Sequence, residues 1–256
     1  MHDGDQIMTP THVSWRLAPQ KPEIETNDIH VWRADLKIHE DRLCDYSQIL
    51  SVEERDRSAR FKFQKDRDHF IAAHGILRVI LSRYLHIDPN RLRFYNNDFG
   101  KPFLDQPTEP ETLRFNMSHS NGLALYAVSH DREVGIDLEY LRPIDNAEQI
   151  AKRFFSSREI EQLRALPEHM QNEGFFHCWV RKEAYIKAIG KGLFQPLDQF
   201  DTSLSPDGSS TLLHSSEYPR ETTPWSLMDI HPHPDFTAAL SVEGHDYQLK
   251  CWQWSE

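Results

Sequence analysis

The sequence predicts an α+β protein built as two pseudo-symmetric α/β lobes within one chain. Its 256 residues fit two lobes of about 100–130 residues each. Each half offers a long helical pattern and several short strand-like segments in a similar order, although the halves share no close sequence repeat. A turn at residues 130–132 separates the two sets of elements. We therefore expect an N-terminal lobe over residues 1–130 and a C-terminal lobe over residues 131–256.

The first half begins with a strand and continues with two helical stretches. Residues 28–34 (DIHVWRA) are typical of a short strand. Ser51 is suited to cap a helix that carries Glu53 and Glu54 in its first turn, where acidic groups favour the helix dipole. Apolar residues recur at helical spacing over residues 65–85, which predicts a second and longer helix.

Further strands and helices are expected after residue 85. Strand-like segments are expected at residues 92–95, 114–117, 122–129 and 133–139. Helices are expected at residues 147–166 and 174–189, and a final strand within residues 247–254.

Composition limits the class of protein. No window approaches the run of about 18 apolar residues that a membrane-spanning helix needs, and the N-terminus lacks the apolar segment of a secretory signal. Cys44, Cys178 and Cys251 lie far apart and form no CxxC pair, so we expect a cytoplasmic protein with free thiols. No membrane partner is expected.

The charge is unevenly distributed. The net charge of −11 argues against a nucleic-acid partner. Residues 51–101 nevertheless hold eleven Lys or Arg against seven Asp or Glu. A basic segment on an acidic protein suits a small polyanionic ligand, whereas the alternative is a set of solvated helix faces.

Two acids lie close together in the segment VGIDLE, residues 134–139. On a strand Asp137 and Glu139 project from the same face, while Ile136 and Leu138 point inward. Adjacent carboxylates repel each other, so the pair favours a hard cation such as Mg²⁺ that leaves room for phosphate oxygens. The alternative is a strand with one solvated acidic face.

A second charged pair lies in WVRKEAYIKAIGKG, residues 179–192. On a helix Glu183 and Lys187 are i,i+4 neighbours, and this order forms a favourable ion pair. The structural alternative is a surface salt bridge of about 0.3–0.5 kcal/mol. The functional interpretation has Glu183 completing a metal site and Lys187 reaching a phosphate.

Two shorter motifs add polar groups. FNMSHS, residues 115–120, ends a strand with hydroxyls and an imidazole that suit phosphate oxygens, and a Ser-His hydrolase is disfavoured because no GxSxG motif is present. In FGKP, residues 99–102, glycine turns the chain and proline stiffens it. We therefore expect the side chain of Lys101 to point outward.

In this order GKP, NMSHS, GIDLE, FFSSREIEQL and KEAYIKAIGKGL resemble the Sfp-type 4′-phosphopantetheinyl transferases from Phe99 to Leu193. The length is similar to the Sfp type, with two lobes in one chain, and not to the shorter trimeric synthase type. The resemblance implies the 4′-phosphopantetheinyl transferase fold, with the active site at the lobe interface. Val180 departs from the small or hydroxyl residue usual in relatives, which affects local packing only.

The resemblance also implies roles for matching residues. Asp137, Glu139 and Glu183 would bind Mg²⁺ (or Mn²⁺), and Glu183 would act as general base, directly or through water. Lys187 would hold the coenzyme A pyrophosphate. Other coenzyme A contacts are implied for Lys101, Ser118 and His119, with Arg55, Arg57, Arg60 and Arg67 as unranked candidates for the 3′-phosphate.

The reaction implied is Mg²⁺-dependent transfer of 4′-phosphopantetheine from coenzyme A to a serine of an apo acyl- or peptidyl-carrier protein. Such an enzyme, a holo-acyl-carrier-protein synthase, is expected as a monomer. The carrier is expected to dock on residues 140–157, unless that segment packs wholly within its own lobe. Two alternatives remain: a catalytically silent binding protein, which would have lost a metal acid or Lys187, and a magnesium-dependent nucleotide hydrolase.

Overall fold

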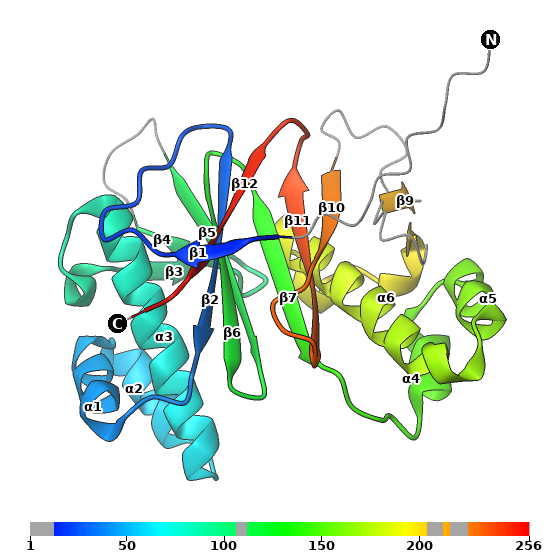
Figure 1. The fold of residues 1–256 in the computed structure, drawn as a ribbon, viewed down its shortest axis with the longest axis horizontal. Helices are drawn as coiled ribbons and strands as arrows, with labels where there is room; N and C mark the ends of the chain where they lie inside the picture. Colours follow the sequence, from blue (N-terminus) through cyan, green and yellow to red (C-terminus); the bar gives the residue numbers. More distant parts are fainter. Residues whose placement is uncertain (1–12, 106–111, 204–211, 216–224, 256) are drawn as a thin grey trace.

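The computed structural model describes residues 13–105, 112–203, 212–215 and 225–255 (Figure 1). It confirms the α+β class. Two sheets lie side by side in the middle of the molecule, and helices cover them at both ends (Figure 1). The first sheet packs against α3 and the second against α6.

The first sheet has five strands in the order β1-β12-β2-β6-β5. Its members are β1 (Trp15–Leu17), β12 (Gln248–Gln253), β2 (Asp28–Asp35), β6 (Leu123–His130) and β5 (Leu113–Ser120). Strand β12, from the C-terminal end of the chain, pairs in parallel with β2 and β1. The division into two lobes at residue 130 stays a prediction. Strand β12 does not follow it, because this strand comes after residue 130 in sequence but belongs to the sheet formed by β1, β2, β5 and β6.

The second sheet has three antiparallel strands, β10 (Trp225–Ile230), β11 (Phe236–Glu243) and β7 (Val134–Tyr140). Two short hairpins complete the described β-structure: β3 (Phe94–Asn96) with β4 (Pro102–Leu104), and β8 (Phe200–Thr202) with β9 (Leu212–Ser215). Side chains from both large sheets, including Val31, Leu125, Ile136 and Leu240, form one shared apolar cluster. The sheets are thus joined by a continuous core.

The first sheet packs against α3 (Gln64–Leu85), and α1 (Glu40–Ile49) and α2 (Val52–Ala59) in turn pack against α3. Helix α2 begins as expected, because the Ser51 side chain accepts a hydrogen bond from the Glu54 amide while the Glu54 side chain accepts one from the Ser51 amide. Helix α1 was not expected from the sequence. Short 3₁₀ turns occupy Pro89–Arg91, Gly192–Phe194 and Leu197–Gln199.

The other helices are α4 (Ala147–Phe154), α5 (Ser157–Ala165) and α6 (Glu168–Ile189). The expectation of one helix over residues 147–166 is wrong, because the chain becomes extended at Phe155 and Ser156. Ser156 and Glu159 form a second reciprocal cap, which starts α5 afresh. Helix α6 begins six residues earlier than expected, directly after Pro167.

Candidate functional site

A cleft of about 920 Å³ lies where the two halves of the chain meet. Helices α2 and α3, the β3–β4 loop and the end of β5 supply walls from the first half, and α6 supplies the wall from the second. Six of the predicted site residues line the cleft. They are Arg57, Lys101, Ser118, His119, Glu183 and Lys187.

Asp137 lies beside the cleft and is held by two of these residues. The ammonium of Lys187 lies 2.6 Å from Asp137 Oδ1 and donates to Ser118 Oγ at 3.1 Å. Ser118 Oγ in turn donates to Asp137 Oδ1 at 3.0 Å. Asp137 is only 6% exposed and the Lys187 side chain is 28% exposed, so this is a partly buried ion pair. It joins α6 to β7 and differs from the pair of Glu183 with Lys187 that the helical spacing predicted.

The strand β7 presents its acids as the sequence predicted. Ile136 and Leu138 are buried in the core shared by the two sheets. Asp137 and Glu139 point to the other face, where α6 packs against β7. Glu139 Oε2 accepts a hydrogen bond from Ser120 Oγ at 3.3 Å.

The three acids influence one another electrostatically. Burial raises the pKa of Glu183, and the charge of Asp137 raises it further. Burial also raises the pKa of Glu139, again with a contribution from Asp137. A raised pKa means that the ionised carboxylate is destabilised, and a nearby cation would stabilise that ionised form.

The acids fit a magnesium ion in number and kind. Within the described ranges no three His, Cys, Asp or Glu side chains are gathered tightly enough to hold a metal by themselves. Mg²⁺ does not require such a set, because it commonly takes one or two carboxylates together with water and substrate phosphates. Asp137 Oδ2 is buried and has no hydrogen-bond partner in the described part of the chain, which leaves one ligand oxygen uncommitted.

His119 and Arg57 bring positive or potentially positive groups to the same cleft. Burial among protein atoms lowers the pKa of His119, and Lys187 and His69 lower it further, although the side chain reaches solvent at the cleft mouth. An imidazole of lowered pKa is neutral at pH 7 and acts there as a hydrogen-bonding group. The Arg57 guanidinium stacks over the Phe70 ring, 5.4 Å from its centroid.

The structure separates the four arginine candidates. Arg57 lines the cleft, whereas the other three do not. Arg55 donates to the carbonyl of Leu50, Arg60 is exposed at the end of α2, and Arg67 is half-buried on α3. Sequence reasoning missed other lining residues, including His74 and Arg93. It gave no role to Phe99 and Asn116, which line the cleft and lie within the FGKP and FNMSHS motifs. A lone histidine or arginine carries no spacing signal that would have revealed His74 or Arg93.

Lys101 differs from its expected orientation. Its side chain is 6% exposed, and the expectation that it points outward is wrong. Its ammonium donates to Glu133 Oε2 at 2.6 Å, to the Ala188 carbonyl at 2.7 Å and to the Val134 carbonyl at 3.3 Å. These acceptors satisfy all three donors of the ammonium.

Lys182 anchors the helix that carries Glu183. Its ammonium lies 2.8 Å from Glu159 Oε2 and donates to the carbonyls of Leu197 and Phe200, each at 2.6 Å. Glu159 is completely buried and also receives hydrogen bonds from Thr202. Val180, the departure noted above, is fully buried against Ala184, Leu227 and Ala239.

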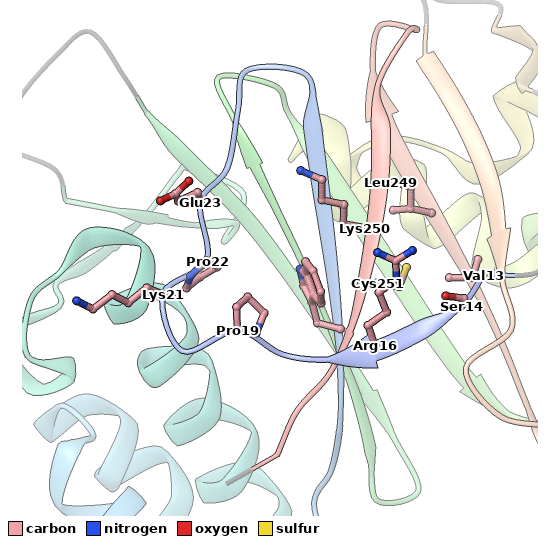
Figure 2. Close-up of a pocket in the computed structure, with 11 residues that line it drawn as sticks. Val13, Ser14, Arg16, Pro19, Lys21, Pro22, Glu23, Leu249, Lys250 and Cys251 are labelled. Carbon is pink, nitrogen blue, oxygen red and sulfur yellow. The ribbon is translucent and has the colours of Figure 1, made fainter.

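A second hollow, of about 510 Å³, lies between β1, the loop that follows it and β12. Figure 2 shows Arg16 on β1 and Lys250 on β12 at its walls. It shares no lining residue with the cleft, and none of the predicted site residues lines it.

Comparison with known proteins identifies the family. Residues 37–131 match the model described as 4′-phosphopantetheinyl transferase, N-terminal, and residues 133–243 match the 4′-phosphopantetheinyl transferase superfamily. The chain is 39% identical over 242 residues to 4′-phosphopantetheinyl transferase HetI of a Nostoc species, covering 94% of this chain and 98% of that protein. The chain belongs to the 4′-phosphopantetheinyl transferase superfamily.

The similarity to Sfp supports an Sfp-type 4′-phosphopantetheinyl transferase. Sfp itself, from Bacillus subtilis, is 33% identical over 211 residues, covering 80% of this chain and 92% of Sfp. A holo-(acyl-carrier-protein) synthase from Bacillus anthracis, solved in complex with CoA (3′,5′-ADP), overlaps 44% of this chain and 96% of its own, with 23% identity and a TM-score of 0.37. Among the described residues of this transferase, no helix is both long and apolar enough to span a membrane.

Proposed function

We propose that this transferase binds coenzyme A in the cleft and passes its 4′-phosphopantetheine group to a serine hydroxyl of an apo acyl- or peptidyl-carrier protein. The observation that carries this proposal is that Glu183 and Lys187 line one cleft together with Arg57 and His119. Asp137 lies beside that cleft, paired with Lys187, and its charge acts on Glu139 and Glu183. Acids for a cation and basic groups for phosphates are what transfer from a pyrophosphate requires.

Coenzyme A fits the cleft in size and charge. A volume of about 920 Å³ is at the upper end of the range, about 300–1,000 Å³, for small-molecule sites. Arg57 and His119 are the candidates for the 3′-phosphate, and Ser118 and Lys187 for the pyrophosphate. Lys101 contributes its aliphatic stem to the wall, while its ammonium is turned to protein acceptors.

Asp137, Glu139 and Glu183 are the residues that would hold Mg²⁺, or Mn²⁺ in its place. When bound, the ion supplies positive charge that offsets the pyrophosphate oxygens. Asp137 offers its uncommitted Oδ2, and Glu139 and Glu183 lie in the same electrostatic environment. The fit rests on these oxygen donors, which suit hard cations.

Glu183 is the proposed general base. Its raised pKa brings it closer to the working pH, which improves a base for abstracting a hydroxyl proton. The carrier serine oxygen forms a bond to the β-phosphorus, and its proton passes to Glu183 directly or through a water. The bond from the β-phosphorus to the bridging oxygen breaks, and adenosine 3′,5′-bisphosphate leaves with that oxygen. Lys187 offsets the charge that develops on the leaving phosphate.

Mass spectrometry of a purified apo-carrier protein incubated with the transferase, coenzyme A and Mg²⁺ tests the proposal. A carrier that gains the mass of one phosphopantetheine group supports it. Consumption of coenzyme A with an unchanged carrier indicates the nucleotide hydrolase, and binding without consumption indicates the silent binding protein. The retention of Asp137, Glu139, Glu183 and Lys187 favours the transferase over the silent protein.

We further propose that the enzyme works in the cytoplasm as a monomer, without a nucleic-acid or membrane partner. The free thiols of Cys44, Cys178 and Cys251 support a reducing compartment. Light scattering at the working concentration tests the monomer, with a dimer mass as the contrary result.

A further inference from the structure

Lys101 joins the two segments that carry the catalytic groups. Glu133 and Val134, which accept from its ammonium, begin the strand β7 that leads to Asp137. The Ala188 carbonyl, its third acceptor, follows Lys187 directly on α6. A single buried ammonium therefore bonds to the start of the metal strand and to the last turn of the helix that bears Glu183 and Lys187.

The strand and the helix cross in backbone contact at this point. A Cβ atom added at Gly135 would lie 2.1 Å from the Ala184 carbonyl oxygen and 2.3 Å from the Ala188 nitrogen. Such distances admit only glycine. The crossing lies two residues before Asp137 on β7, and Ala184 directly follows Glu183 on α6. The spacing of the site acids thus depends on how closely β7 and α6 approach each other here.

The loop that carries Lys101 is itself fixed to the end of α6. Asn97 Nδ2 donates to the Gly190 carbonyl at 2.8 Å, and Asn97 Oδ1 accepts from the Lys101 amide at 2.9 Å. Gly190 has a φ of +69°, and a Cβ there would lie 2.9 Å from Lys101 Cδ. Phe99 and Phe194 form an edge-on ring contact across the same junction. The ammonium is therefore presented by a tightly held loop.

We propose that Lys101 is a positioning residue that sets the approach of β7 to α6, and that its ammonium is not a coenzyme A phosphate ligand. This inference rests on the proposed transfer reaction and concerns the same site. Since all three ammonium hydrogens point to protein acceptors, a phosphate could be reached only by breaking the pair with Glu133 or a buried hydrogen bond to the carbonyl of Val134 or Ala188. Burial lowers the pKa of Lys101 while Glu133 opposes that shift, as expected for a charge paired inside the protein.

The two roles predict different kinetics. Loss of a phosphate ligand raises the Michaelis constant for coenzyme A and weakens the salt dependence of its binding. Loss of a positioning residue lowers kcat, because misplacement by about 1 Å can cost up to about a hundredfold in rate. We expect Lys101→Met to lower kcat by at least about tenfold, with the Michaelis constant and salt dependence for coenzyme A unchanged.

Glu133→Gln is the second variant, because Glu133 does not line the cleft. It removes the charge that holds the Lys101 ammonium, and we expect the same loss of kcat without a change in coenzyme A binding. Glu133→Gln also removes the contact of Glu133 Oε1 with Arg114 Nε at 3.3 Å. The double variant should therefore lose less kcat than the product of the two single losses, since both changes act on the shared pair of Lys101 with Glu133. Lys21→Met, at an exposed lysine outside the cleft, is the control for removal of a lysine charge.

The experiment measures kcat and both Michaelis constants with an apo-carrier protein. Calorimetry at two salt concentrations measures the affinity for coenzyme A. Thermal melts first show that each variant is folded. If the wild-type enzyme does not modify the carrier, the proposed function is overturned, whereas the contacts of the Lys101 ammonium with its protein acceptors stand. A raised Michaelis constant for coenzyme A with a flatter salt response in Lys101→Met overturns the inference. If that variant does not fold, a Glu133→Gln enzyme with wild-type kcat overturns it instead.

Discussion

Lys187 Nζ lies 2.6 Å from Asp137 Oδ1, so the lysine implied to hold phosphate is already paired with an acid implied to hold metal. The two residues come from α6 and β7, fifty positions apart in the sequence. A divalent cation on Asp137 would compete with this ammonium for the same carboxylate. Release of Lys187 from Asp137 would then leave its charge available to a phosphate oxygen.

This competition predicts the behaviour of Lys187→Met. Removing the ammonium leaves Asp137 without the cation that pairs with it, although Ser118 still donates to its Oδ1, so the variant should bind Mg²⁺ more tightly than the wild type. A charge-assisted hydrogen bond of about 1.5–3 kcal/mol corresponds to roughly a tenfold or larger gain. Calorimetric titration with Mg²⁺ measures this gain in affinity.

Asp137→Asn should bind Mg²⁺ weakly and have no detectable turnover. Asp198→Asn, which changes an exposed acid outside the cleft, serves as control. Equal Mg²⁺ affinity in Lys187→Met and wild type contradicts the competition.

The raised pKa values of Glu139 and Glu183 predict a pH-dependent stability. For a carboxyl group whose pKa is higher in the folded state, the folded protein binds more protons, so its stabilising contribution is lost as the pH rises above the ordinary value of 4.5 and through the folded value. At neutral pH in EDTA, Glu139→Gln and Glu183→Gln should therefore melt at or above the wild-type temperature. Both variants should lack activity.

Thermal melts between pH 5 and neutral pH provide the check, and added Mg²⁺ should raise the wild-type melting temperature more than that of either variant. A variant that melts well below the wild type in EDTA would show that the carboxylate is stabilising in the apo protein, against the direction of the pKa shifts.

Coenzyme A binding should depend on Arg57 and His119. Arg57→Ala should weaken binding and flatten its salt dependence, because one cation fewer faces the phosphates. His119→Ala should weaken binding less at pH 7 than at pH 6, since phosphate favours the protonated imidazole. Calorimetry with coenzyme A and with 3′-dephospho-coenzyme A distinguishes contacts to the 3′-phosphate from contacts to the pyrophosphate. Arg91→Ala, an exposed arginine outside the cleft, is the matched control; if it behaves like Arg57→Ala, the assignment fails.

The carrier is expected to bind near α4. Phe155 is buried and stacks on Phe175, and Phe154 packs against Trp179, so these two rings belong to the core of this region. Arg142 and Arg153 remain exposed and basic, and they would attract a carrier that presents acidic groups beside its serine. Arg153→Glu should raise the Michaelis constant for the carrier severalfold and leave that for coenzyme A unchanged.

Steady-state kinetics with each substrate varied in turn measures both constants for Arg153→Glu. Arg158→Glu on α5 reverses the same charge just outside the segment and is the control. If both constants rise together in Arg153→Glu, the helix has a structural role and the carrier binds elsewhere.

The Lys182–Glu159 pair predicts a large effect on stability. Lys182→Met leaves the Glu159 carboxylate buried without its cation, which costs about 3–5 kcal/mol of the free energy of unfolding. The exposed pair of Arg164 with Glu148 offers a comparison, because Arg164→Met should cost no more than about 1 kcal/mol. Urea denaturation of both variants gives the two values. A small loss in Lys182→Met would mean that the neighbouring donors to Glu159 compensate for the ammonium.

Local patterns predicted local structure well. The two-residue period of VGIDLE placed Asp137 and Glu139 on one face of β7, and the apolar repeat of residues 65–85 gave α3 almost to the residue. The break at Ser156 could also have been found, since Ser156 and Glu159 have the spacing of a capping box. The long helix was expected because its apolar residues continue across the break.

Contacts between distant segments could not be predicted in this way. The acceptors of Lys101 lie 32 to 87 residues away in sequence, and nothing in the GKP motif shows which backbone carbonyls will meet its ammonium. The four arginine candidates look alike in sequence, but only Arg57 lies on the helix face that reaches the cleft. Such choices depend on how the two halves pack together.

The place of β12 between β1 and β2 determines when the first sheet can be completed during synthesis. Strand β2 pairs with β6 on one side and with β12 on the other, and residues 248–253 are translated after all the residues that line the cleft. Until they leave the ribosome, one edge of β2 has no partner strand, and an unpaired edge invites association with other chains. The nascent protein therefore has a stage at which almost the whole cleft has been translated but its supporting sheet is still open.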